Sequence, residues 1–329
     1  MKHMKLSPFM KGFLKATVCF LMLIFISIYL LENWSKIEDY DFEIDFLYAG
    51  LAVLSILIAQ FFLALALKNV VRLMKFEISM KKICLILFYS QIAKYLPGGI
   101  WGYVGRVYLY TREGMKAKDA SACVLLETII VVLCGVFVLL MLLLISLFFF
   151  DKIPSIEWLS ESCLDEIGIL FLIVLLLFVI HPRILNFIWG LMPAKICKYK
   201  PEINYKYLSL LKPGLFMVFF WLGIGTGFWF LIRSFFGIDP YLLPITTAVY
   251  ILSWIAGVIV FFIPGGLGPR EAVLIVSLNL YLPISISAIT AVAARIWWVL
   301  GELIWASFSY LWNRLDNGRI EGVAQKINM

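Results

Sequence analysis

The sequence predicts an all-α polytopic membrane protein with about six full spans and two re-entrant Pro-Gly-Gly helical hairpins. The 329 residues are 63% hydrophobic and only 15% charged, with a mean hydropathy of +0.97. Soluble domains carry roughly 25% charged residues, so this composition excludes an ordinary soluble protein. No stretch outside the apolar runs is able to bury a soluble core, and we therefore expect a single transmembrane domain over residues 1–329.

Charges between the apolar runs predict the orientation of the chain. The amino-terminal segment, residues 68–82 and the carboxy-terminal tail are basic, whereas residues 32–45 are acidic. The positive-inside rule therefore places both termini in the cytoplasm. Residues 181–212 are basic, aromatic and interrupted by proline, so we expect this segment to lie at the cytoplasmic interface. The runs expected to cross fully are about 16–31, 46–67, 120–149, 167–180, 213–235 and 285–312.

Two copies of a Pro-Gly-Gly motif interrupt helical runs. The first is KYLPGGIWGYVGR, from Lys94 to Arg106, and the second is FIPGGLGPREAV, from Phe262 to Val273. The runs on either side of the first motif, 83–95 and 100–110, are too short to cross a bilayer, which predicts a re-entrant hairpin. Proline removes a donor and glycine frees the backbone, so polar groups are exposed at each break and need protein or water around them. The residues at the two breaks are Pro97, Gly98, Gly99, Pro264, Gly265, Gly266 and Gly268.

The two motifs belong to a predicted pair of internal repeats, about 83–149 and 245–312. Three full crossings separate the hairpins, and this odd number predicts that the copies are inverted in the membrane. Inverted repeats with broken helices are typical of alternating-access transporters, which bind their ligand near the bilayer midplane. A shift of 168 residues aligns Ala120, Val124 and Glu127 of the first copy with Ala288, Val292 and Arg295 of the second.

Seven charged residues are expected at membrane depth, where each costs at least ~2.5 kcal/mol and needs a partner or water. Four are basic and three are acidic, so one positive charge is left over, which a phosphate is able to neutralise. Arg270 lies at the start of a helix, where backbone amides and the helix dipole favour an anion. The seven predicted substrate-binding residues are Lys94, Arg106, Glu127, Arg270, Glu271, Arg295 and Glu302.

In the functional interpretation, the three arginines hold an anion, and Glu127 and Glu302 pair with arginines when the site is empty. The same features also have structural explanations. A Pro-Gly-Gly break is also found as a packing kink, and Glu127 with an arginine is also a plausible structural ion pair. Lys94 and Glu271 are long enough to extend to an interface. The tryptophans of the last span, Trp297, Trp298 and Trp305, are typical of packing or belt positions.

The paired motifs resemble a known family. The pattern K-Y-L-P-G-G-I-W-x-x-x-G-R, a glutamate in the next span, and P-G-G-x-G-x-R-E are similar to the lysylphosphatidylglycerol synthase transmembrane region, a flippase-like membrane family, over about residues 46–310. The resemblance implies a bacterial cytoplasmic membrane protein whose motif residues serve lipid movement. Long members also have a cytosolic aminoacyl-transferase domain. The sequence ends soon after its last span, so we expect neither that domain nor its synthetic activity.

We therefore expect a translocase of an anionic phospholipid or lipid-linked phosphate in envelope-lipid or surface-polysaccharide assembly. We expect no enzyme activity, cofactor, metal or nucleic-acid partner, because no nucleotide-binding loop and no His-Glu-x-x-His motif occurs. Two alternatives stay open. Asp39, Asp41, Glu43 and Asp45 are similar to the acidic metal-binding loop of polyprenyl-phosphate-dependent membrane glycosyltransferases. The other alternative is a non-transporting membrane partner of a separate lipid or polysaccharide synthase.

Overall fold

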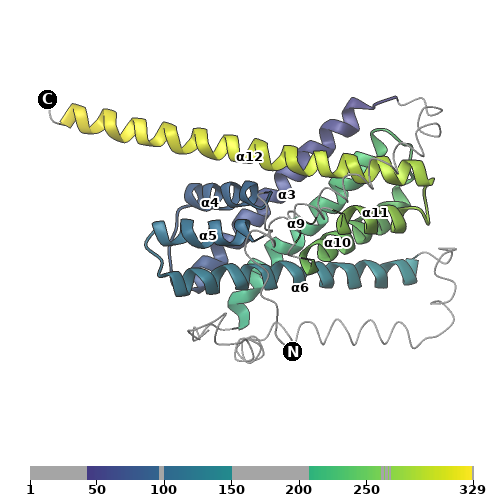
Figure 1. The fold of residues 1–329 in the computed structure, drawn as a ribbon, viewed down its shortest axis with the longest axis horizontal. Coiled ribbons are helices and arrows are strands. Elements are labelled where there is room, and N and C mark those ends of the chain that lie inside the picture. The colour runs from purple at the N-terminus through teal and green to yellow at the C-terminus, as the bar shows by residue number, and fades with distance from the viewer. Residues whose placement is uncertain are drawn as a thin grey trace, which may run out of the picture.

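The computed structural model describes the backbone of residues 43–95, 100–149, 207–260, 263, 266 and 268–327. Throughout this part of the chain the regular elements are helices, so the predicted all-α class is confirmed. In chain order they are α3 (Phe46–Leu73), α4 (Met80–Ala93), α5 (Trp101–Arg112), α6 (Ala117–Phe149), α9 (Tyr207–Arg233), the 3-10 turn η2 (Pro240–Leu242), α10 (Leu243–Ile259), α11 (Pro269–Leu278) and α12 (Ile284–Ile327). Figure 1 shows α12 running along the whole bundle and extending past it at the carboxy-terminal end.

Five helical segments within the described residues are long and apolar enough to cross a membrane. Those in α3, α6, α9 and α12 correspond to four of the six predicted spans, while the runs 16–31 and 167–180 lie outside the described residues. Of the predicted interfacial segment 181–212, the structure describes only residues 207–212, which begin α9.

The fifth candidate span, Pro240–Ile259, contains α10, for which we predicted one arm of the second hairpin. Pro240 is the first residue of η2 and Pro244 the second of α10, and they start this helix earlier than expected, because the fixed φ of proline suits a first helical turn. Length and composition therefore do not separate a full span from a half-hairpin here, and the re-entrant arrangement stays a prediction.

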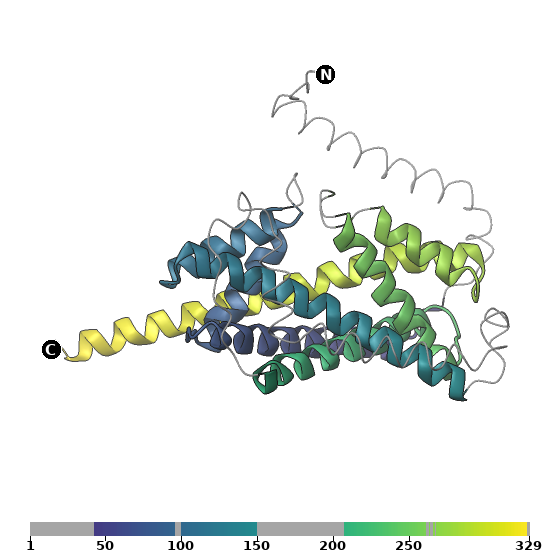
Figure 2. The same cartoon turned by 90° about the horizontal axis from the view of Figure 1, so that it is seen from below.

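Two pairs of shorter helices pack together, α4 on α5 and α10 on α11. The 14, 12 and 10 residues of α4, α5 and α11 correspond to roughly 21, 18 and 15 Å, well below the ~30 Å hydrocarbon core. Figure 2 shows both pairs on one side of the bundle, with α3 and α9 toward the other. The break residues Pro97, Gly98, Gly99, Pro264 and Gly265 lie outside the described part of the chain, whereas Gly266 and Gly268 adopt φ values of +67° and +94°.

The long helices hold the bundle together through small residues and tryptophans. α3 and α9 make the most extensive contact, and a Cβ at Gly223 would lie only 3.0 Å from Ala59, so glycine is needed for this close approach. The indole N–H of Trp297 donates to the Ala52 carbonyl at 2.9 Å, and that of Trp305 donates to the Leu57 carbonyl at 3.0 Å. These two tryptophans therefore fix α12 against α3, as predicted for packing residues.

Candidate functional site

A cavity of about 140 Å³ lies among the helices, and four of the seven predicted charged residues line it. These are Lys94 before the first break, Arg106 on α5, Glu127 on α6 and Arg270 on α11. Apolar residues of α3, α9 and α10 form much of the remaining wall, including Leu63, Leu67, Phe220 and Trp254. The cavity thus has cationic groups beside an apolar surface. Glu271, Arg295 and Glu302 lie outside its lining.

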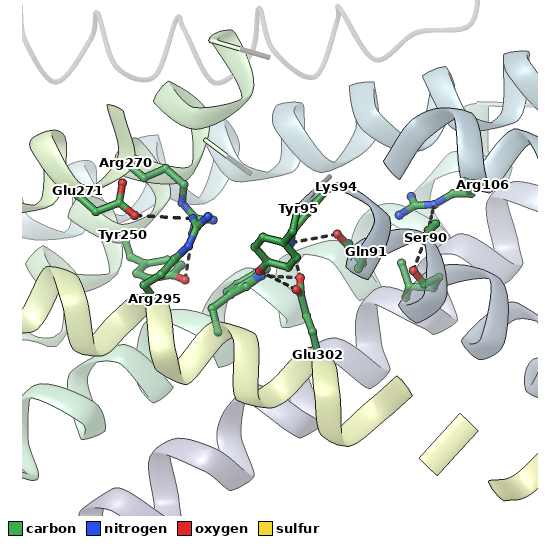
Figure 3. Close-up of polar contacts among 12 residues, drawn as sticks. Ser90, Gln91, Lys94, Tyr95, Arg106, Tyr250, Arg270, Glu271, Arg295 and Glu302 are labelled. Carbon is green, nitrogen blue, oxygen red and sulfur yellow. Dashed lines mark hydrogen bonds and ion pairs between the residues drawn. The ribbon is translucent and has the colours of Figure 1, made fainter. Parts of the chain in front are cut away.

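One buried ion pair joins α5 to α6. The Arg106 guanidinium lies 3.1 Å from a Glu127 carboxylate oxygen, and the two side chains are 12% and 1% exposed. Arg106 also donates through Nε to the Ser90 hydroxyl at 3.0 Å, a contact drawn in Figure 3. The hydroxyl of Tyr110 donates to the other Glu127 oxygen at 2.5 Å. The predicted pairing of Glu127 with an arginine is therefore present in the structure.

A second ion pair joins the end of α4 to α12. The Lys94 ammonium donates to the carboxylate of Glu302, which also accepts from the Tyr95 hydroxyl at 2.9 Å and the Trp298 indole N–H at 2.6 Å. Figure 3 shows Lys94 and Tyr95 pointing toward Glu302. We expected Glu302 to pair with one of the three site arginines. The packing of α4 on α12 brings a lysine of the other predicted repeat to it instead.

The third ion pair joins α11 to α12. Glu271 is buried, lies 3.6 Å from Arg295 and accepts from the backbone amide of Gly268 at 2.7 Å. It therefore satisfies an amide at the start of α11 and does not extend to an interface. The first predicted repeat has its arginine on the short helix and its acid on the long helix, while the second has these charges exchanged.

Arg270 differs from the other six charged residues. Its side chain is buried, and one Nη donates to the Tyr250 hydroxyl at 3.2 Å. Its guanidinium also lies 5.7 Å from the Tyr250 ring centroid and 5.2 Å from that of Trp298. Among the described side chains, the other six charged residues form the three ion pairs. The partners of Arg270 are instead a tyrosine hydroxyl and two aromatic rings.

Several residues of the site were not predicted from the sequence. A Cβ at Gly257 would lie 2.6 Å from Arg270 Cγ, and one at the positive-φ Gly266 would lie 3.1 Å from Arg270 Cδ, so both glycines leave room for the arginine stem. Trp298 lines the cavity between Arg270 and Lys94, whereas we interpreted it as a packing residue. A single aromatic or glycine in an apolar helix gives no signal that distinguishes such a contact from ordinary packing.

The acidic segment that suggested a metal-dependent alternative is only partly described. Asp39 and Asp41 lie outside the described residues, and Glu43 is exposed. The Asp45 carboxylate accepts from the amides of Leu47 and Tyr48 at 2.9 and 3.3 Å and so caps α3. Across the described ranges no three His, Cys, Asp or Glu side chains gather as metal ligands would.

The helices and the cavity define a multi-pass helical membrane protein with buried, mostly paired charges among its spans. Over residues 13–305 the chain matches the family described as "Lysylphosphatidylglycerol synthase TM region", and it belongs to this family. The family suggested by the Pro-Gly-Gly motifs is thereby confirmed. No curated protein matches the sequence.

Proposed function

We propose that this protein translocates an anionic phospholipid or a lipid-linked phosphate across a bacterial cytoplasmic membrane, without chemical turnover. The observation that supports this most strongly is Arg270, a buried cation on the cavity wall that contacts no acid within the described part of the chain. An isolated charge at membrane depth is costly. A phosphate in the cavity would supply the missing counter-ion and would form charge-assisted hydrogen bonds with the guanidinium.

The two ion pairs at the cavity provide contacts that differ between an empty and an occupied site. Lys94 and Arg106 line the cavity, yet each is paired with a carboxylate, Glu302 or Glu127. A phosphate that reaches Arg270 would compete with these carboxylates for both cations. Weakening of the Lys94–Glu302 pair would loosen the contact between α4 and α12, which belong to different predicted repeats. A ligand shifts a conformational equilibrium only through such differential contacts.

Reconstitution in liposomes tests the proposal. Phosphatidylglycerol with a fluorophore on one acyl chain would be placed in both leaflets, and a membrane-impermeant reductant would bleach the outer leaflet. We expect a second, slower bleaching phase with the wild-type protein and its loss in Arg270→Ala and Arg106→Ala. Arg112→Ala is a matched control, because Arg112 is an exposed arginine on the same helix as Arg106 and does not line the cavity.

Folding must be separated from function in this test. Arg270→Gln retains most of the side-chain volume and an amide donor but removes the charge, so it should insert normally and still fail to move lipid. Arginine-independent movement would remove the proposed role of the cavity cations. Absence of movement for every anionic lipid, with normally folded protein, would favour a non-transporting partner of a separate synthase.

A further inference from the structure

The carboxylate on the cavity wall is already paired with a cation and buried. Lys94, Arg106 and Arg270 face one acid, Glu127, among the described residues that line the cavity. Glu127 accepts from the guanidinium of Arg106 at 3.1 Å and from the hydroxyl of Tyr110 at 2.5 Å, and it is 1% exposed. Because its charge is matched by Arg106 and its side chain is almost completely buried, Glu127 is not placed to receive the ammonium group of a ligand.

The two neighbouring acids are engaged as well and lie off the cavity wall. Glu302 accepts from a lysine, a tyrosine and a tryptophan. Glu271 accepts from the amide of Gly268 and pairs with Arg295. While the ion pairs are intact, an ammonium group in the cavity would therefore meet Arg270, which has no carboxylate partner among the described residues, and two cations whose carboxylates are already paired. Arg270 would repel this group, because like charges repel strongly away from water.

Neutral polar groups, in contrast, are present on the same wall. The side-chain oxygen of Gln91 accepts from Lys94 at 3.2 Å, a bond that does not use the NH₂ group of the amide. The Thr128 hydroxyl donates to the Val124 carbonyl at 2.9 Å, which leaves its oxygen lone pairs as acceptors. Tyr103 adds a phenol to the lining. These groups suit hydroxyls, which both donate and accept.

We propose that the cavity selects headgroups in which a phosphate is joined to a polyol, such as glycerol or a sugar, and discriminates against headgroups that carry an amine. The phosphate pairs with Arg270, and the hydroxyls bond to Gln91, Thr128 and Tyr103. This inference rests on the proposed function, since it takes a lipid headgroup as the occupant of the cavity. It also implies that an aminoacylated lipid, whose lysyl ester has two ammonium groups, is not the preferred cargo of this family member.

A competition experiment on the full chain in detergent tests the selectivity independently of movement. Unlabelled phosphatidylglycerol, phosphatidylethanolamine and lysylphosphatidylglycerol with identical acyl chains would compete with phosphatidylglycerol that has a fluorophore on one chain. We expect the two amine lipids to need about tenfold higher concentrations for half displacement. Arg270→Gln should abolish this preference, and Arg112→Ala should leave it unchanged.

A variant that is expected to gain binding of amine lipids distinguishes a change of selectivity from misfolding, because a misfolded protein would lose binding. Gln91→Glu adds a carboxylate to the wall, so amine lipids should bind more tightly in it and the preference should fall to about threefold or less. Equal or tighter binding of the lysyl or ethanolamine lipid to the wild type would overturn the proposal, as would a preference that Gln91→Glu does not change.

The liposome assay with the same three lipids separates this inference from the proposed function. Arginine-dependent movement of all three lipids at equal rates would preserve the translocase and overturn the selectivity. A binding preference without movement of any lipid would preserve the selectivity and overturn the translocase. If none of the three lipids binds or moves, both the selectivity and the translocase function are overturned.

Discussion

Gly257→Ala offers a sharp test of how the site holds Arg270, because the change adds one methyl group directly against the arginine stem, while the Cα of Gly266 at the second break stays at an ordinary contact distance of 3.7 Å. Built on the present backbone, that Cβ would lie 2.6 Å from Arg270 Cγ and 2.8 Å from Cδ. Ordinary carbon contacts begin near 3.4 Å, so the arginine stem must move by about 0.8 Å. The 3.2 Å bond from Arg270 to the Tyr250 hydroxyl would then lengthen toward 4 Å, which is no longer a hydrogen bond.

The size of the effect follows from what the displaced guanidinium loses. A hydrogen bond to a charged group contributes about 1.5–3 kcal/mol, and mispositioning Arg270 removes at least one such bond with a bound phosphate. Binding of phosphatidylglycerol should weaken by about 10- to 150-fold. Helix formation itself should not suffer, since alanine is favoured over glycine in a helix by up to ~1 kcal/mol. Gly50→Ala in α3 is the matched control, because a Cβ there meets no atom within 4 Å.

A double-mutant cycle decides whether the effect passes through Arg270. Binding would be measured by fluorescence anisotropy with acyl-chain-labelled phosphatidylglycerol for Gly257→Ala, Arg270→Ala and the combination. Removing the stem relieves the overlap, so Gly257→Ala should cause no further loss in the Arg270→Ala background. Wild-type affinity in Gly257→Ala, or an undiminished loss in the double variant, would refute the reasoning.

Three further predictions follow from the polar contacts. Glu302→Gln leaves the partly buried Lys94, 19% exposed, without its carboxylate and should lower folding stability by up to ~3 kcal/mol, seen as a lower melting midpoint in detergent, and adding Lys94→Met should recover part of the loss. If the stability losses of Glu302→Gln and Lys94→Met simply added in the double variant, the pairing of Lys94 with Glu302 would be contradicted. Glu127→Gln should lower the midpoint yet tighten phosphatidylglycerol binding by about tenfold, because the charge of Arg106 then acts on the cavity; weaker binding would contradict this. Asp45→Ala should remove the α3 cap and reduce folding stability by ~1 kcal/mol, while lipid binding stays unchanged. Loss of lipid binding in this variant would instead favour the alternative of a metal-binding acidic loop.

The spans and the charged residues of the interior were predictable because their signals are local. A long apolar run is a membrane helix in any tertiary context, so α3, α6, α9 and α12 appeared near their predicted positions. A charge within such a run is costly wherever the helix packs, and this identified all seven charged residues before the fold was known. Their count of four cations and three acids also predicted one cation in excess.

Helix boundaries at the second motif were less predictable. α10 and η2 together reach the length of a span, although the sequence indicated half of a hairpin. A short apolar run bounded by proline and glycine is compatible with either arrangement, and the choice depends on how neighbouring helices cover it. The same dependence on neighbours applies to Gly257, Tyr250 and Trp298, whose roles come from contact with Arg270.

By itself, the sequence determined the class of protein, its family, the two motifs and the set of interior charges. The tertiary structure decided which charges pair. Glu302 pairs with Lys94 across the contact between α4 and α12, and Glu271 pairs with Arg295. Arg270 lies beside aromatic rings on the cavity wall. The physical reason is that the penalty for a buried charge depends on its own segment, whereas the partner that relieves the penalty is chosen by the packing of helices distant in sequence.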